Sequence, residues 1–179
     1  SLAALFFLAL LPSLLMADRP VPNIVLMMAD DMGIGDTSAY LGKKPEPGME
    51  AIGRTLRTPN LEAFAEDAVV FTRAYAPASM CSSTRYSLLT GRFSHRAYLK
   101  KQGWLPHGPN TPMIHTQITT LPEMLQGKGY HTGIIGKYHV GMTFPGIDGD
   151  LADEFDYRDI DFSLPVVDGP THHGFDEFF

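Results

Sequence analysis

Cys81 and Arg85 are the first pair of residues whose types and spacing suit chemistry. Cys81 is the only cysteine in the sequence, and Arg85 follows it by four positions. On a helix, residues four apart share one face, so the guanidinium would lie about one turn from the sulfur. Backbone N–H groups and the helix dipole favour negative charge at the first turn. The segment 76–92 therefore predicts a site for an anion, and the alternative for Cys81 is a small buried apolar side chain.

A second chemical feature is the adjacent pair Asp30 and Asp31, which directly follows the apolar run 23–29. Two neighbouring carboxylates repel each other unless a cation lies between them. Ligands that offer only oxygen favour Ca²⁺ or Mg²⁺ over zinc. The pair predicts a divalent cation site, and a solvated turn or a helix cap remains the alternative.

Lys137 and His139 form the third feature, because they follow the predicted strand 131–135 with one residue between them. Side chains alternate along an extended chain, so a cation and a titratable imidazole would face the same side. Taken without other information, such a pair is also compatible with an ordinary exposed surface.

The elements that must position these residues alternate between strands and helices. Strands are predicted at 23–29, 69–75 and 131–135, and helices after Thr58 and over 119–128. The unbroken apolar run at 23–29 is typical of a strand buried on both faces of a parallel sheet. In such sheets, ligands bind beyond the carboxyl ends of the strands, where the chemical features above also fall. The predicted class is α/β, with a mainly parallel sheet flanked by helices.

The two helix predictions also assign faces. In the helix after Thr58, the inward side should carry Leu61, Phe64, Ala65 and Ala68, and the outward side Glu62, Glu66 and Asp67. In the helix over 119–128, Leu121, Met124 and Leu125 should point inward, and Pro122 suits the first turn.

Three motifs in order resemble the type I sulfatase family. They are P-N-I-V-L-M-M-A-D-D, then C-S-S-T-R with a downstream T-G-R, and then G-K-Y-H-V-G. The family writes the second motif C-x-P-S-R, so Ser83 stands where proline is usual. Tyr138 stands where the third motif usually has tryptophan. Three ordered motifs are far more specific than one, and the resemblance runs from about Pro22 to the end of the chain.

The resemblance implies a nucleophile made by modification. A maturation enzyme would oxidise Cys81 to formylglycine, whose hydrated aldehyde attacks a sulfate ester. Asp30 and Asp31 would hold a divalent cation beside the modified Cys81, with Ca²⁺ expected and Mg²⁺ or Mn²⁺ as alternatives. The substrate would be an aryl, choline or carbohydrate sulfate.

The resemblance also implies roles for three basic residues. Lys137 would contact the sulfate and the nucleophile, and His139 would hydrogen-bond the formylglycine hydroxyl. Arg85 would help Lys137 to neutralise the sulfate oxygens. The family takes its remaining metal and sulfate ligands from sequence beyond Phe179, so we expect this chain to be an inactive fragment.

The same resemblance implies the alkaline-phosphatase-like fold, incomplete here, with residues 18–179 as the N-terminal part of the catalytic domain. Residues 2–16 form an apolar run shorter than the about 20 residues of a membrane span. We expect residues 1–17 to be a signal peptide, with no stable membrane span. The protein would then be exported to a periplasm, the extracellular space or a lysosomal or secretory lumen.

Composition narrows the function classes further. The formal net charge is −6 and charged residues make up 19% of the chain, so there is no basic footprint for nucleic acid. The segment 93–118 reads as a loop with Trp104. His95, His107 and His115 in it show no metal-type spacing, so each is expected to be a surface or capping residue. The acidic stretch after Gly141 lacks an ordered calcium-loop pattern, and a solvated insertion is expected.

Two alternative functions stay open. A phosphomonoester or phosphonate hydrolase of the same superfamily would use similar acidic ligands. A non-catalytic binder of sulfated glycans, with Cys81 unmodified, is compatible with Ser83 in the motif.

Overall fold

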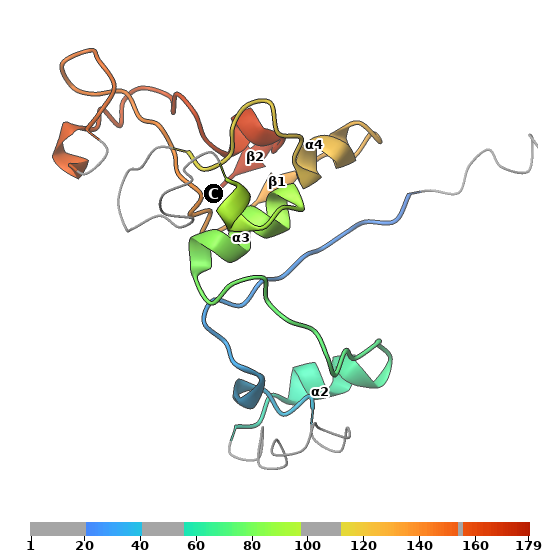
Figure 1. The fold of residues 1–179 in the computed structure, drawn as a ribbon. Coiled ribbons are helices and arrows are strands. Elements are labelled where there is room, and N and C mark those ends of the chain that lie inside the picture. Colours follow the sequence, from blue (N-terminus) through green and yellow to red (C-terminus); the bar gives the residue numbers. More distant parts are fainter. Residues whose placement is uncertain (1–20, 41–55, 98–111, 154–155) are drawn as a thin grey trace, which may run out of the picture. The chain divides into compact units, whose positions relative to one another are not determined.

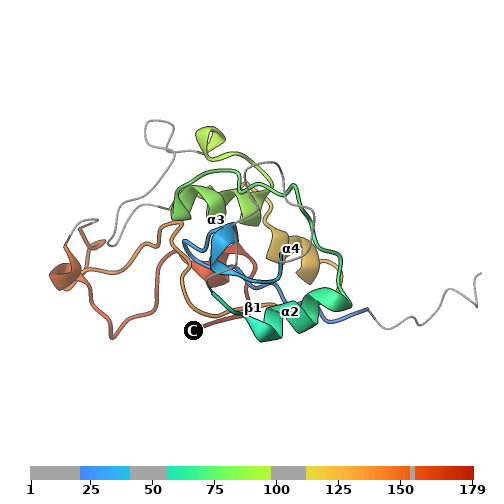
Figure 2. The ribbon, with the colours of Figure 1, turned by 90° about the horizontal axis from the view of Figure 1, so that it is seen from below.

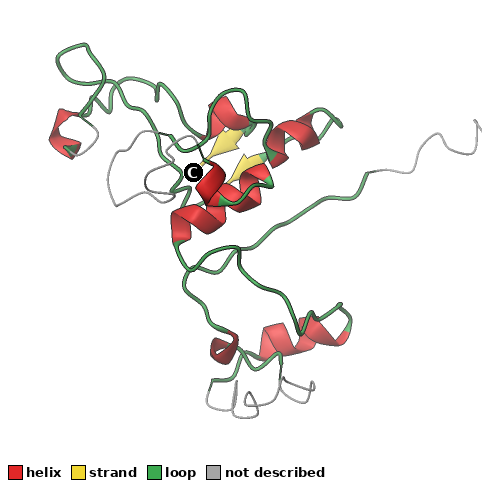
Figure 3. Cartoon of the chain, viewed as in Figure 1, coloured by secondary structure: helices red, strands yellow, loops and turns green. Residues whose placement is uncertain are grey.

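The computed structural model describes residues 21–40, 56–97, 112–153 and 156–179. Contacts divide the chain into two compact units, residues 1–30 and 31–179. Loops and turns connect short helices and strands (Figure 3). The signal peptide predicted at 1–17, most of the loop predicted at 41–56, and Trp104 and His107 lie outside the described residues.

The described residues contain three α-helices, one pair of strands and four 3₁₀ helices. In chain order these are η1 (Ile34–Asp36), α2 (Pro59–Glu66), α3 (Cys81–Thr90), η2 (Ser94–Arg96), α4 (Leu121–Gln126), β1 (Gly133–Ile134), η3 (Tyr157–Asp159), η4 (Pro170–His173) and β2 (Glu177–Phe178). No helix among them is both long enough and apolar enough to cross a lipid bilayer.

The strands β1 and β2 pair in parallel, with Gly133 opposite Glu177 and Ile134 opposite Phe178. Hydrogen bonds continue past the strands, because Gly136 N donates to Phe179 O at 2.8 Å. In Figure 1, helices α3 and α4 lie beside this strand pair, and Figure 2 shows α3 and α4 as neighbours from a second direction. The predicted class, a parallel α/β sheet flanked by helices, is confirmed.

A hydrophobic core forms around one face of α3. Tyr86 and Leu89 point from this helix into a cluster with Ala97, Met113, Ile114, Tyr138 and Val140. Tyr86, Met113 and Val140 are fully buried. Since Tyr86 and Leu89 are three residues apart on α3, they present one continuous apolar face. This core fixes the orientation of the helix that begins at Cys81.

Two predicted strands do not form. Residues 23–29 and 69–75 are extended or bent chain outside any strand, with Val25 81% and Phe71 68% exposed. A strand needs a hydrogen-bonded neighbour, and within the described ranges β1 and β2 form the sheet. An apolar run therefore signals a tendency to be buried but does not provide the pairing partner.

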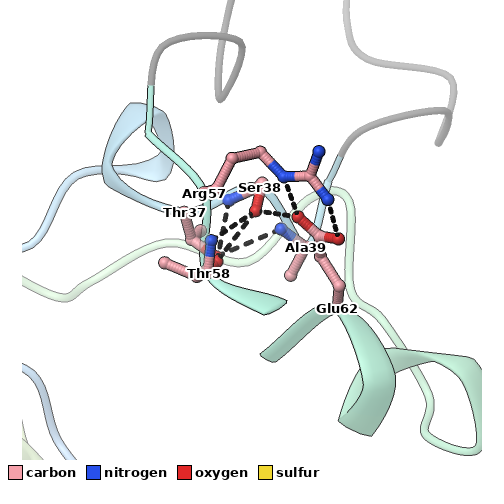
Figure 4. Close-up of polar contacts among 6 residues, drawn as sticks. All are labelled: Thr37, Ser38, Ala39, Arg57, Thr58 and Glu62. Carbon is pink, nitrogen blue, oxygen red and sulfur yellow. Dashed lines mark hydrogen bonds and ion pairs between the residues drawn. The ribbon is translucent and has the colours of Figure 1, made fainter. Parts of the chain in front are cut away.

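Helix α2 begins after Thr58, as predicted, but its assigned faces are only partly correct. Leu61 and Phe64 are 40% and 69% exposed, whereas Ala65 is buried. Glu62, which was expected to point outward, accepts hydrogen bonds from Ser38 and Arg57 (Figure 4). Polar contacts rather than apolar packing therefore orient this helix.

Helix α4 is shorter than the predicted segment 119–128, and a capping box fixes its start. Thr120 Oγ1 accepts from Glu123 N at 3.3 Å, while Thr120 N donates to Glu123 Oε2 at 2.7 Å. Pro122 is buried in the first turn, and Met124, which was predicted to point inward, is 58% exposed. The inward prediction for Met124 is wrong because the buried side of this helix is that of Pro122, with Leu121 and Leu125 half-buried.

Gly174 closes η4 and lies against the first turn of α4. Its φ is +90°, and a Cβ there would lie 2.4 Å from Glu123 N. Thr120 Oγ1 also donates to His173 O at 2.7 Å, across the same contact. Only glycine combines this left-handed backbone with so close an approach.

The acidic stretch after Gly141 forms a loop closed by isolated bridges. Thr143 pairs with Asp168 at its base, and Gly146 pairs with Ile160 farther out. Its carboxylates make mostly local hydrogen bonds, such as Asp161 Oδ1 with Ser163 Oγ at 2.6 Å. Ile147 and Phe162 are 68% and 75% exposed. The prediction that this stretch is largely solvated is confirmed.

Asp176 joins the segments that lead into the two strands. Its Oδ2 accepts from Thr132 N at 2.7 Å and from Thr132 Oγ1 at 3.0 Å, and its Oδ1 accepts from Gln126 Nε2 at 2.8 Å. Hydrogen bonds from the Thr132 backbone and side chain, then Gln126 and the charge of His131, lower the pKa of Asp176. The ionised carboxylate is therefore part of the folded structure.

We expect Asp176→Asn to make the stability of the protein less dependent on pH. The carboxyl of Asp176 has a lower pKa in the folded state than in the unfolded state, where it is about 3.9. Its ionised form therefore stabilises the fold above the unfolded-state pKa. This stability is lost as the pH falls through the folded-state pKa. The melting temperature of the variant should lie below wild type at pH 6.5, and the difference should shrink below about pH 4. Asp67→Asn, at an exposed carboxylate after α2, is the matched control and should show no such convergence. A difference that stays constant with pH would contradict this role.

Candidate active site

Cys81 is the first residue of α3, as the sequence predicted. Met80, at the N-cap, has φ −117° and ψ 136°, so the chain enters the helix from an extended conformation. Thr84 fixes this entry, because its N–H donates to Met80 O at 3.0 Å and its hydroxyl donates to Ala78 O at 2.7 Å. The Cys81 side chain is half-buried. The thiol thus lies at the end of the helix where the backbone favours negative charge.

Arg85 connects α3 to the segment after β1. It lies one turn from Cys81, and its Nη1 donates a hydrogen bond to the backbone carbonyl of Lys137. A guanidinium carries five N–H donors in a planar fork, so it can hold a carbonyl and face an anion at the same time. The structure therefore brings Arg85 to the Lys137 backbone, across 52 residues of sequence.

Burial alternates along residues 137–140, as predicted for this segment. Lys137 is exposed and His139 half-buried, while Tyr138 and Val140 are buried in the core. His139 has a φ of +49°, which is uncommon for a residue with a side chain. The core contacts of Tyr138 and Val140, and the hydrogen bond from Met113 N to Val140 O at 2.8 Å, hold this conformation. Such strain is found most often at functional sites.

Tyr138, the residue before His139, is buried and lies near a negative charge. Burial raises the pKa of Tyr138, and the nearby negative charge of Asp168 raises this pKa further. Asp168 in turn lies 2.8 Å from Nε2 of the buried His173. Tyr138 therefore lies near the Asp168 carboxylate, which is itself bonded to a buried histidine.

Asp30 and Asp31 are both exposed, and they lie at the division between the two compact units. Asp31 opens the second unit with a φ of +55°, so the chain turns sharply after the extended segment 21–29. Within the described ranges, no group of three or more His, Cys, Asp or Glu side chains gathers closely enough to hold a metal. The structure brings together Cys81, Arg85 and the Lys137 backbone but shows no contact from Asp31 to them.

Comparison with known proteins decides the family. The profile of the Sulfatase family matches residues 22–179. This chain belongs to the sulfatase family. Steryl-sulfatase of Mus musculus is 34% identical over 170 residues, which cover 90% of this chain and 22% of that protein. N-acetylgalactosamine-6-O-sulfatase of Bacteroides thetaiotaomicron is 36% identical over 121 residues, covering 68% of this chain and 21% of the relative.

The sulfatase fold is also found by structural comparison. A solved Bacteroides thetaiotaomicron structure, described in connection with the metabolism of multiple glycosaminoglycans, matches with a TM-score of 0.61 and 30% identity. The match covers 84% of this chain and 26% of that one. The alkaline-phosphatase-like α/β fold predicted from the sequence is confirmed. The chain spans about a fifth of the length of the curated sulfatases described above.

Ser83, which replaces the proline usual in the sulfatase motif, lies in the first turn of α3. Its side chain is buried, and its carbonyl accepts from Ser87 Oγ at 2.9 Å. First-turn N–H groups have no helical partner, so proline would also fit the backbone there. The helix therefore forms from Cys81 onward with serine in this position.

The donor set of Asp30 and Asp31 fits part of a calcium shell. Both offer carboxylate oxygens, which hard divalent cations prefer, and both are accessible. Two carboxylates are fewer than the six to eight oxygen ligands that Ca²⁺ usually takes. These two sulfatase residues would supply charge and a fraction of the ligands.

Several supporting residues were not predicted. No local sequence pattern indicates the hydrogen bond between Asp168 and His173. The capping box of Thr120 and Glu123 was also missed, although its T-x-x-E pattern could have predicted it. His95 and His115 were predicted to be surface or capping residues, and this is confirmed. His95 stacks on Phe93 with ring centroids 5.7 Å apart, and Nδ1 of His115 accepts from Gln117 N at 3.2 Å.

Proposed function

We propose that the natural protein containing this chain hydrolyses sulfate monoesters, with Cys81 converted to formylglycine by a maturation enzyme. The observation that carries this proposal is the contact between Arg85 and the Lys137 carbonyl. It connects the helix that begins with the candidate nucleophile to the segment that holds Lys137 and His139. Membership of the sulfatase family supports the same reaction.

The basic side chains would neutralise the substrate. A sulfate monoester is an anion, so a nucleophile approaches it more easily when its oxygens face fixed positive charge. Arg85 offers a planar fork of donors from α3, and Lys137 is a compact charge on an exposed side chain. The first turn of α3 adds backbone N–H groups at the same place.

The modified Cys81 would supply a hydrated aldehyde, in which one hydroxyl attacks sulfur and the other allows sulfate to be expelled as the aldehyde re-forms. His139 is the candidate to accept the proton from the second hydroxyl, because an imidazole nitrogen can act as a general base. Asp30 and Asp31 would hold Ca²⁺, or Mg²⁺ or Mn²⁺ in its place, which would polarise the sulfate oxygens.

The substrate class is an aryl, steryl, choline or carbohydrate sulfate. The similar proteins include a steryl-sulfatase and an N-acetylgalactosamine-6-O-sulfatase, so both flat apolar and sugar alcohols belong in a test panel. Residues 1–17 would direct the protein to an exported compartment, and residues 18–179 would form the N-terminal part of its catalytic domain.

Two measurements on the natural protein test this function. The first is mass spectrometry of the tryptic peptide 74–85, which contains Cys81 between the cleavage sites Arg73 and Arg85. Formylglycine lowers the mass of this peptide relative to the thiol, and an unmodified thiol throughout would overturn the proposal. Met80 lies in the same peptide, so its sulfoxide, which raises the mass, must be scored separately.

The second measurement compares kcat/KM on sulfate and phosphate esters that share one leaving group. The sulfate ester should be the better substrate by at least about tenfold, a difference of about 1.4 kcal/mol. A preference for the phosphate ester would favour a phosphomonoester hydrolase, and no turnover of either ester would favour a non-catalytic binder.

A further inference from the structure

The acidic stretch after Gly141 carries the whole net charge of the chain. Residues 144–167, which we call the acidic lobe, hold seven acidic residues and one basic residue. The complete chain has 20 acidic and 14 basic residues, so the remainder is balanced, with 13 of each. The formal net charge of −6 is therefore concentrated in one short part of the sequence.

The acidic lobe is folded back on itself and keeps carboxylates at its surface. Gly146 pairs with Ile160 across the lobe, and Ile160 is only 5% exposed. Asp148, Asp150 and Asp153 are all exposed. Because the backbone is held by this pairing, these three carboxylates form a fixed negative surface.

The base of the lobe lies close to His139. Thr143 N donates to Asp168 O at 2.8 Å, so the two ends of the lobe meet at this bridge. Thr143 follows His139 by four residues, a length of chain that spans at most about 14 Å. Met142, between them, packs against the hydrophobic core cluster. The lobe therefore begins beside the segment 137–140.

A second hydrogen bond limits how far from His139 the acidic residues can be. Asp161 N donates to Pro145 O at 2.9 Å. Pro145 is six residues after His139, so Asp161 N lies at most about 25 Å from the His139 Cα. The Debye length is about 30 Å at 0.01 M salt and about 8 Å at 0.15 M. At low ionic strength, the charge of the lobe would thus act on a charged substrate bound near His139.

We propose that the acidic lobe makes this sulfatase selective for esters whose only negative charge is the reacting sulfate. The inference rests on the proposed function, since it takes the substrate to bind beside Lys137 and His139. The basic side chains would hold the reacting sulfate, whereas every further negative charge on the substrate would be repelled by the lobe. Uncharged and cationic alcohols avoid this repulsion. Aryl, steryl and choline sulfates should therefore be preferred over polysulfated carbohydrates.

The test uses the natural protein and two aryl sulfates with the same phenol leaving group. One of them carries two additional sulfonates on a side arm remote from the phenol. The quantity measured is the ratio of kcat/KM for the trianionic ester to kcat/KM for the monoanionic ester. Asp150→Lys combined with Asp153→Lys reverses two exposed charges of the lobe, and should raise this ratio about threefold at about 0.01 M salt. At about 0.5 M salt, the ratio should equal that of wild type.

Two further variants act as controls. Glu66→Lys combined with Asp67→Lys changes the net charge by the same amount at exposed positions outside the lobe, and should leave the ratio unchanged. Asp150→Asn combined with Asp153→Asn removes the charges with little change of shape, and should raise the ratio about twofold in case the lysine variant fails to fold. All these variants should hydrolyse the monoanionic ester with kcat/KM within about twofold of wild type, because the altered residues are outside the proposed catalytic groups.

Three results would overturn the inference: an unchanged ratio at low salt, an equal rise in the variant outside the lobe, or a rise that persists at high salt. Each of them leaves the proposed function intact, because wild type still hydrolyses the monoanionic ester. If wild type hydrolyses neither ester, the proposed function and this inference are both overturned.

Discussion

Replacing Cys81 by serine should lower kcat for sulfate ester hydrolysis by at least about a thousandfold in the natural protein. Serine offers a single hydroxyl, whereas the proposed formylglycine hydrate offers two. The first hydroxyl would still attack sulfur, but no second hydroxyl on the same carbon would remain to expel the sulfate. The variant should therefore release at most one equivalent of alcohol per site and then stop, which a rapid-mixing assay would measure.

Cys81→Ala is the matched control for this experiment, because it removes the nucleophile altogether. It should show neither turnover nor a single-equivalent burst, while circular dichroism should match wild type, since the half-buried Cys81 is outside the main core cluster. Turnover by either variant within about tenfold of wild type would rule out a covalent role for this position.

Replacing Gly174 by alanine should destabilise the protein by about 2–5 kcal/mol. Two effects add at this position. The backbone has a φ of +90°, which costs a residue with a Cβ about 1–2 kcal/mol. The new Cβ would also lie 2.4 Å from Glu123 N and 2.9 Å from Glu123 Cα, which are backbone atoms at the capped start of α4. The measurement is the free energy of unfolding in urea.

Gly129→Ala separates the two effects. Gly129 has a φ of +83°, but a Cβ there would meet no atom within 4 Å. This variant should lose only the backbone contribution, about 1–2 kcal/mol. The difference between the two variants measures the steric cost at the contact between η4 and α4. Equal losses would show that α4 moves away without penalty.

Short sequence patterns correctly predicted the parts of the site that depend on residues close together in the chain. The start of α3 at Cys81 follows from an extended entry and a helix-compatible run, and the alternation at Tyr138 and His139 follows from the apolar pattern. The strand before Lys137 is confirmed as β1, although only Gly133 and Ile134 pair. In these places the local pattern predicts which residues are buried, although distant contacts such as Met113 with Val140 hold the final conformation.

Contacts between distant residues were not predictable in the same way. Ser38 donates a hydrogen bond to Glu62, which lies 24 positions later in the sequence. The residue spacing within α2 therefore did not indicate that Glu62 would turn toward polar partners. The apolar runs at 23–29 and 69–75 carry the composition of strands, but pairing depends on a neighbour that composition does not identify. Their exposed Val25 and Phe71 show this difference directly.

The bond between Arg85 and Lys137 affects how mutational kinetics at this site can be read. Its acceptor is a main-chain carbonyl, which every substitution at position 137 retains. Lys137→Ala therefore reports on the ammonium group alone. Any exchange at Arg85 combines loss of a cation with loosening of the tether, so the two single effects will not sum to the double one. A coupling energy measured between these two positions would therefore include the loss of the tether and should not be read as an interaction between two charges alone.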